Sequence, residues 1–185
     1  MFVPLILSAQ NKGHIGFEVG SSTPLAPEIF KSYWNSAFNL GFVFDKPVSD
    51  IFSAGAEANY SGFALDNSLP GFNSDSGYSG GSFNISQLLA VGMISDNYSK
   101  NLITPYGKLG LGLSYTSVPD IITSDGAKVF TGSRETGLGV MLAAGLNFNL
   151  NTGNKITLEG SYRMNKRSGE SFNSLLFDLG YCFGM

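Results

Sequence analysis

Five ionisable residues stand at positions from which they could form one buried charge network. They are Glu18, Glu57, Lys108, Glu159 and Arg163. Each lies in a segment where large apolar residues alternate with small or polar ones, and each occupies the small-residue side. Such a set could carry protons or ions through a pore, or it could pair internally and fill a closed interior. Unpaired buried charge is costly, so we favour internal pairing.

Alternation with a period of two is the signature of a β-strand, because successive side chains point to opposite faces. In the segment that contains Lys108, for example, Leu109, Leu111 and Leu113 alternate with Gly110 and Gly112. We find eight such segments along the chain, and no segment with the 3.6-residue period of a long helix. They span 13–22, 33–45, 50–62, 82–94, 104–117, 136–150, 155–165 and 173–185.

The composition decides which face of these strands meets the surroundings. Charged residues make up 14% of the chain, against about 25% in soluble domains. A face exposed to water should carry Lys, Glu and Thr, whereas the small-residue face is mostly Gly, Ala, Ser and Asn. The large apolar face therefore points to lipid. The sequence predicts an all-β fold, a closed eight-stranded antiparallel up-and-down transmembrane β-barrel with the small residues in its crowded interior.

The segment 82–94 follows the alternation least well. We assign Phe83, Ile85, Leu89, Val91 and Met93 to its lipid face. Gln87 then falls on the apolar side, while Leu88 and Ile94 fall on the inner side.

Aromatic residues on the apolar face collect towards the two ends of the strands, with Leu, Val and Ala between them. Transmembrane barrels carry two such aromatic girdles at the membrane interfaces. The expected girdle residues are Trp34, Phe42, Phe44, Phe52, Tyr60, Phe83, Tyr115, Phe148, Tyr162, Tyr181 and Phe183. A soluble core has no physical reason to sort its aromatic residues by height.

The connections between strands also alternate, with tight turns at one end and mostly longer loops at the other. The longer loops span 23–32, 64–81 and 117–134, and the short segment 166–171 lies on the same side. Residues 1–9 form a short apolar run ending in Ser8-Ala9, which we interpret as the remnant of a truncated signal peptide. Residues 13–185 form the barrel domain.

Several classes of partner are excluded by the sequence. The net charge of −3, without a basic patch, argues against nucleic acid as a partner. A single cysteine, Cys182, excludes an intramolecular disulfide framework. The glycines of "GKLGLG" open no helix, so they do not form a phosphate-binding loop, and we expect no cofactor and no metal.

The alternating strands, "TPYGKLGLGLSY" and the C-terminal "LFDLGYCFGM" resemble the small outer-membrane β-barrel domains related to outer membrane proteins A and X. The resemblance implies a place in a bacterial outer membrane. It also implies that the barrel-assembly machinery reads outward aromatic residues of the last strand, here Phe177, Tyr181 and Phe183. The family usually ends on an aromatic residue, whereas this chain ends in Gly184-Met185.

Three functions remain open. The first is a monomeric, non-enzymatic barrel with a structural or adhesion-like role carried by its outer loops. The second is an outer-membrane lipid-modifying enzyme, which would need a histidine at the outer rim. The only histidine, His14, is expected at the opposite rim, where a structural role is favoured. The third is a soluble lipocalin-like ligand-binding barrel.

Overall fold

A computed structural model describes residues 13–66, 79–97, 99, 101–122, 128–150 and 153–185. The signal-peptide interpretation of residues 1–9 lies outside these ranges. So do residues 67–78 of the predicted loop 64–81 and residues 123–127 of the predicted loop 117–134.

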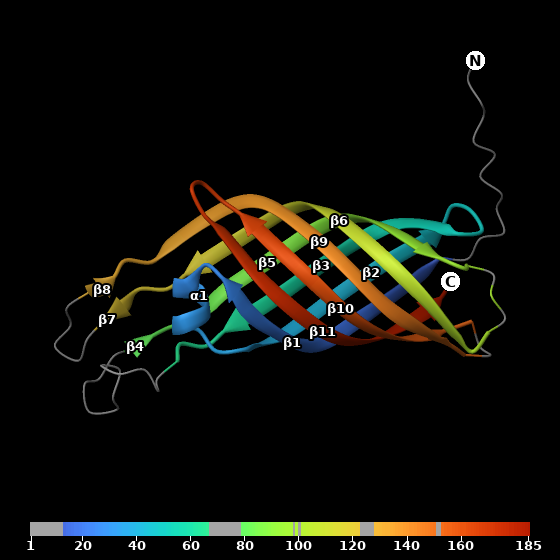
Figure 1. Cartoon of the computed structure of the whole chain (residues 1–185), viewed down its shortest axis with the longest axis horizontal. Helices are drawn as coiled ribbons and strands as arrows, with labels where there is room; N and C mark the ends of the chain where they lie inside the picture. The colour runs from blue at the N-terminus through green and yellow to red at the C-terminus, as the bar shows by residue number, and fades with distance from the viewer. Residues whose placement is uncertain (1–12, 67–78, 98, 100, 123–127, 151–152) are drawn as a thin grey trace, which may run out of the picture.

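Eight long strands form the wall of a closed barrel (Figure 1). Their bounds are β1 (His14–Ala26), β2 (Ala37–Pro47), β3 (Phe52–Phe63), β5 (Phe83–Ser95), β6 (Ile103–Val118), β9 (Ser133–Asn149), β10 (Lys155–Lys166) and β11 (Ser171–Gly184). Their order around the barrel is β1-β11-β10-β9-β6-β5-β3-β2, and β1 pairs antiparallel with both β11 and β2. The predicted closed, antiparallel, up-and-down barrel is confirmed.

The two ends of the barrel differ. At one end, here called the loop end, lie a short helix and three short strands, α1 (Glu28–Tyr33), β4 (Ser79–Gly80), β7 (Ile121–Ile122) and β8 (Lys128–Phe130). The strands β4, β7 and β8 form a separate three-stranded sheet. At the other end, the turn end, lie the start of β1 and the C-terminus (Figure 1).

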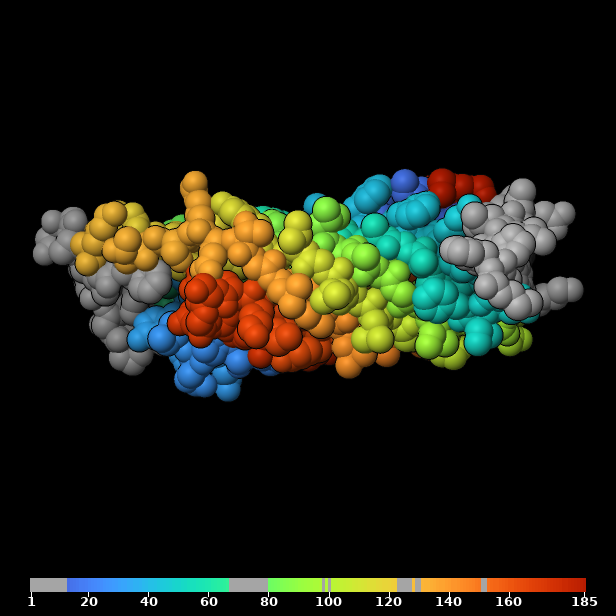
Figure 2. All heavy atoms as spheres, turned by 90° about the horizontal axis from the view of Figure 1, so that it is seen from above, coloured from blue at the N-terminus to red at the C-terminus, as the bar shows by residue number. Residues whose placement is uncertain are grey.

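Two neighbouring strands of the wall, β6 and β9, are longer than a membrane requires. Spanning a bilayer takes about 9–11 residues of tilted strand, whereas β6 has 16 residues and β9 has 17. Figure 2 shows that the molecule is elongated, with α1 (blue) beside the β10–β11 connection (red) at the loop end. The loop end therefore extends beyond the lipid-facing part of the wall, and the extra residues of these strands form its base.

The segment predicted as a strand over 33–45 begins later than expected. Residues 28–33 form α1, which follows Pro27 and carries Glu28 in its first turn and Lys31 in its last. These charges complement the helix dipole. The strand β2 starts only at Ala37, while β1 continues to Ala26, beyond the predicted end at residue 22.

The orientation assigned to the segment 82–94 is wrong. Leu88 is 58% exposed and points to lipid, whereas Leu89 is 1% exposed and points into the lumen. Phe83, Ile85 and Met93 are likewise buried on the inner side. This strand carries apolar residues on both faces, because its inner residues pack against other apolar side chains inside the barrel. The period of two was therefore correct, but the face was reversed.

Candidate functional site

The five predicted luminal ionisable residues all lie inside the barrel and are buried. Lys108 Nζ lies 2.8 Å from Glu57 Oε2 and 2.7 Å from Glu159 Oε2. The Arg163 guanidinium pairs with the other oxygen of Glu57. Glu57 thus binds two cations at once, and the network joins strands β3, β6 and β10.

Polar side chains that were not among the predicted site residues extend this network. Arg163 donates a hydrogen bond to Gln87 Oε1 at 3.0 Å, and Gln87 donates one to Asn165 at 2.8 Å. The Tyr106 hydroxyl donates to Glu159 at 2.8 Å. The sequence analysis placed Gln87 on the lipid face. A polar side chain among the apolar residues of that face was the available signal that the face was reversed.

The fifth predicted residue, Glu18, lies beside the ion pairs. One oxygen from each of Glu18, Glu57 and Glu159 falls within 4.8 Å of the others, a spacing that could also hold a metal ion. However, the Lys108 ammonium already lies against Glu57 and Glu159. The arrangement thus supplies its own cation, and it carries no metal prediction.

Glycines on the inner face make room for the long luminal side chains. A Cβ atom at Gly180 would overlap Thr157 Oγ1 and approach Glu18 Cγ to 2.9 Å. A Cβ at Gly110 would lie 3.0 Å from Met141 Cε and 3.1 Å from Leu89 Cδ1. These contacts are the physical reason for the small-residue face that the sequence displays.

The lumen is filled more completely towards the loop end. Leu89, Met141 and Ala143 form a small apolar cluster inside the barrel. On the turn-end side of the charges, a cavity of about 30 Å³ is lined by Glu18, Lys108 and Lys155 among others. That space suits a water molecule. The luminal residues form a packed interior whose small free space lies towards the turn end.

The turn end opens into a polar hollow of about 390 Å³. At its edge Asp45 accepts a hydrogen bond from Lys155 Nζ at 3.0 Å, and His14 Nδ1 lies 3.2 Å from the other oxygen of Asp45. His14 is therefore at the end opposite α1, as the order of the strands implied.

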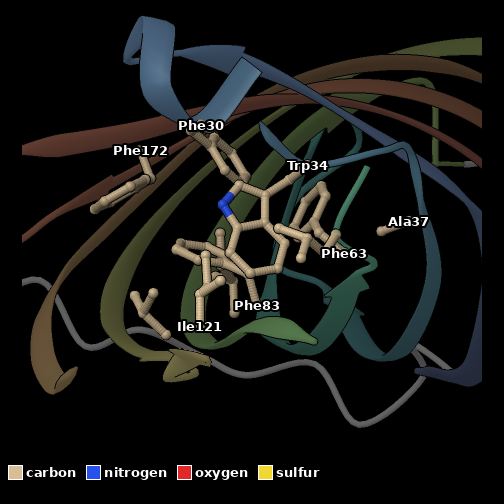
Figure 3. Packing of buried hydrophobic residues seen from close by; sticks show 10 residues of the cluster. Phe30, Trp34, Ala37, Phe63, Phe83, Ile121 and Phe172 are labelled. Carbon is tan, nitrogen blue, oxygen red and sulfur yellow. The ribbon is translucent and has the colours of Figure 1, made fainter. Parts of the chain in front are cut away.

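Loop-end residues pack into a buried apolar cluster over the barrel mouth, which we call the aromatic cap (Figure 3). Its members are Phe30, Trp34, Ala37, Phe63, Leu65, Phe83, Ile85, Val118, Ile121 and Phe172. The Phe30 ring centroid lies 4.8 Å from that of Phe63, 4.7 Å from that of Phe83 and 5.4 Å from that of Phe172. Rings at these separations contribute attraction beyond the area that they bury.

Two of the expected girdle residues belong to the cap instead. Trp34 is 6% exposed and Phe83 is 1% exposed, so neither faces lipid. The cause for Trp34 is α1, which ends the strand pattern and turns the indole inward; for Phe83 it is the reversed face of β5. Backbone hydrogen bonds fix this part of the cap, since Asn35 N donates to Ala64 O and Asp66 N donates to Tyr33 O, each at 2.9 Å.

The other predicted girdle residues lie on the outer surface of the wall. Exposed or half-exposed aromatic residues are Phe42, Phe44, Phe52, Tyr60, Tyr115, Phe148, Tyr162, Tyr181 and Phe183. Phe177, predicted as part of the assembly signal, is exposed on β11. Between the aromatic residues stand exposed leucines, including Leu109, Leu111 and Leu142. Water cannot solvate such a surface without a large free-energy cost, and lipid can.

A pocket of about 370 Å³ opens beside the cap. Phe30, Trp34 and Phe172 form part of its apolar wall, while Arg167 and Glu170 lie at its edge. Arg167 stacks over the Phe172 ring at 4.6 Å and lies 2.9 Å from Glu170 Oε2. The sequence carried no signal for this pocket, because its walls come from segments that are distant in the chain.

Solved structures show what this architecture resembles. Neisserial surface protein A has a TM-score of 0.67 and 11% identity, with 94% of this chain and 97% of that chain covered. The fold is that of a small outer-membrane β-barrel. A major outer membrane protein from Thermus thermophilus has a TM-score of 0.54 and 11% identity over 92% of this chain and 99% of that one.

A further barrel of this kind is the N-terminal β-barrel domain of Pseudomonas aeruginosa OprF. It has a TM-score of 0.51 and 13% identity, with 94% of this chain and 100% of that chain covered. The sequence matches no family model and no curated protein. The described residues contain no helix long and apolar enough to cross a membrane.

Proposed function

We propose that the chain is an integral outer-membrane barrel whose loop end carries a structural or adhesion-like surface role. One observation carries this proposal: the loop-end segments are packed into the aromatic cap above the lipid-facing belt. The strand walls are constrained by lipid on the outside and by packed side chains on the inside. The loop end is therefore the part of the barrel with surface free for recognition.

The filled lumen supports a structural rather than a transporting role for the interior. Buried ion pairs and the Leu89–Met141 cluster occupy the space that a water-filled channel would need. The charges hold opposite walls together, and the protein acts through what it presents at the loop end.

We further propose that the barrel is not an enzyme. The lipid-modifying alternative requires a histidine near the outer rim, and the only histidine of the chain lies at the turn end, where it pairs with Asp45. Incubation of the purified barrel with outer-membrane lipids, followed by mass spectrometry, tests this. Loss or transfer of an acyl chain would contradict it.

Assembly and orientation complete the proposal. The barrel inserts as a monomer with its turn end towards the periplasm. The outward aromatic residues Phe177, Tyr181 and Phe183 present the recognition signal for the barrel-assembly machinery.

The surface role is tested with cells that display the native barrel and a variant in which 119–132 are replaced by a short turn. The replaced segment contains β7, β8 and the cap residue Ile121. We expect the variant to remain heat-modifiable in electrophoresis, yet to lose adherence to host-cell monolayers and to purified carbohydrate and matrix surfaces. The matched control is Ile51→Glu, an exposed turn-end position. Full adherence of the loop variant would contradict the proposal.

A further inference from the structure

We propose that the pocket beside the aromatic cap binds the hydrocarbon chain of a single-chain amphiphile, whose polar head stays at the Arg167–Glu170 ion pair. This inference rests on the proposed surface role and names a ligand class for the same end of the barrel.

The walls of the pocket suit a hydrocarbon chain. They combine Phe30 and Ile29 of α1 with Trp34, Val118 and other apolar residues contributed by separate parts of the fold. Binding pockets are concave and mostly apolar, with a few polar groups that orient the ligand. A volume of about 370 Å³ falls within the range of such pockets. The burial of a chain against these side chains is driven by the apolar area removed from water.

The charged groups of the pocket, Arg167 and Glu170, both come from the connection between β10 and β11. Arg167 is fixed there by four side-chain contacts: its ring contact with Phe172, its ion pairs with Glu170 at 2.9 Å and Glu135 at 3.9 Å, and a hydrogen bond of 3.1 Å to Ser133 Oγ. The Glu170 side chain remains half-exposed. A ligand with a polar head and an apolar body matches this division, whereas a ligand that is polar throughout would leave its groups unpaired against the aromatic wall.

The position of the pocket supplies the source of the ligand. Arg167 directly follows the end of β10, and β11 begins at Ser171, so the polar edge belongs to a short connection between two strands of the lipid-facing wall. Ile29, at the pocket, is 64% exposed. An amphiphile from the outer leaflet can therefore enter with its head near the membrane surface and its chain against α1 and the cap.

Trp34 provides a direct readout, because it lines the pocket and is the only tryptophan of the chain. The barrel is placed in nanodiscs of phosphatidylcholine without bromine and titrated with a single-chain alkyl glucoside that carries bromine at its chain end. Bromine quenches indole fluorescence on contact. We expect saturable quenching of Trp34.

Two matched variants separate pocket binding from partition into the bilayer. Ile29→Glu should weaken the apparent affinity for the alkyl glucoside by about tenfold or more. It removes an apolar contact and places a charge against the hydrocarbon chain of the ligand. Ile51→Glu, at an equally exposed site on the turn end, should leave the affinity unchanged. In a Trp34→Phe, Phe38→Trp variant the reporter faces lipid, and its quenching should rise with probe concentration without saturation.

Non-saturable quenching of Trp34, or equal affinity in the Ile29→Glu variant, would overturn the inference. The inference would also be overturned if a water-soluble aromatic compound bound saturably and the alkyl glucoside did not. The adherence assay is independent of this readout. Loss of adherence in the loop variant together with no quenching would reject the amphiphile and keep the surface role.

Discussion

Arg163 on β10 and Glu57 on β3 form an ion pair across the full width of the barrel. In the strand order β10 and β3 are separated by three strands in either direction, so they lie on opposite walls. Lys108 on β6 binds the same glutamate. The lumen is thus braced from three sides by buried charges.

Removal of Arg163 should be strongly destabilising, because it leaves the Glu57 carboxylate buried with only one cation. We expect Arg163→Ala to lower the free energy of unfolding by about 3 kcal/mol or more. Urea titration in detergent micelles, followed by the electrophoretic shift between folded and unfolded forms, measures this. Arg134→Ala, at an exposed arginine near the start of β9, is the matched control. A variant as stable as the native barrel would mean that Arg163 is solvated.

The packed lumen predicts an absence of large conductance. With Arg163, Gln87, Leu89 and Met141 buried within the barrel, no continuous water path is expected. Planar-bilayer recordings of the purified barrel should show no stable current steps of the size produced by water-filled porins. Regular steps of that size would contradict the closed arrangement of these side chains.

Glycines on the two faces of the wall should respond oppositely to an added methyl group. Gly180→Ala places a Cβ against Thr157 and Glu18, and we expect a loss of about 1–3 kcal/mol from overpacking. Gly160→Ala meets only ordinary contacts with Phe177, at 3.5 and 3.8 Å, and should be neutral or stabilising by up to about 1 kcal/mol. Unfolding midpoints of the two variants in one detergent provide the comparison. Equal midpoints would argue against a crowded interior.

The aromatic cap should open without unfolding the barrel. Phe30→Ala removes the ring that touches Phe63, Phe83 and Phe172. We expect a red shift of the Trp34 emission and faster hydrogen exchange in 28–36, with unchanged exchange in the middle of the strands. Ile29→Ala, at the exposed neighbour, should leave both signals as they are. Faster exchange throughout the wall would show that the cap and the barrel unfold as one unit.

At the loop end, the Lys128 ammonium and the Gly132 amide both donate hydrogen bonds to Asp120, at 2.8 and 2.7 Å. The hydrogen bond from Lys128 and that from Gly132 lower the pKa of Asp120. A lowered pKa means that the contribution of Asp120 to stability is present above its unfolded pKa of about 3.9, and is lost as the pH falls through the folded pKa. The Gly132 amide resonance should titrate with a midpoint below about 3.9, and Lys128→Gln should raise that midpoint. A native midpoint at or above the unfolded value would contradict the contact.

The sequence predicts the wall of the barrel well except for the faces of β5, because in the other strands the residues that face lipid are mostly large and apolar and those that face the lumen are mostly small or polar. Leu109 and Gly110, for example, can only exchange faces if the whole strand shifts by one residue. It predicts the two ends poorly. Trp34 and Phe83 were predicted to face lipid. An aromatic residue near a strand end can lie at the membrane interface or be buried under a loop, and the sequence alone is the same in both cases. Only the contacts between distant segments distinguish them.

The same limit applies to the lumen. Alternation places Glu57, Lys108 and Arg163 on one face, but it gives neither their heights nor the partner of each charge, which depend on the stagger between strands. Gln87 shows that an isolated polar residue on an apolar face is informative even so. Its position identifies the true inner face of β5, provided that the polar residue is weighed more heavily than its apolar neighbours.

The pairing of β1 with β11 determines when the chain can fold during its synthesis and insertion into the membrane. The first and last strands of the wall share one seam, so no portion of the chain synthesised before β11 can satisfy the edge hydrogen bonds of β1 by this route. A helical membrane protein can enter the bilayer one segment at a time, whereas an open sheet edge is not tolerated in lipid. The chain must therefore reach the membrane complete and still unfolded, and its exposed leucine-rich faces must be shielded by other molecules until the seam is made.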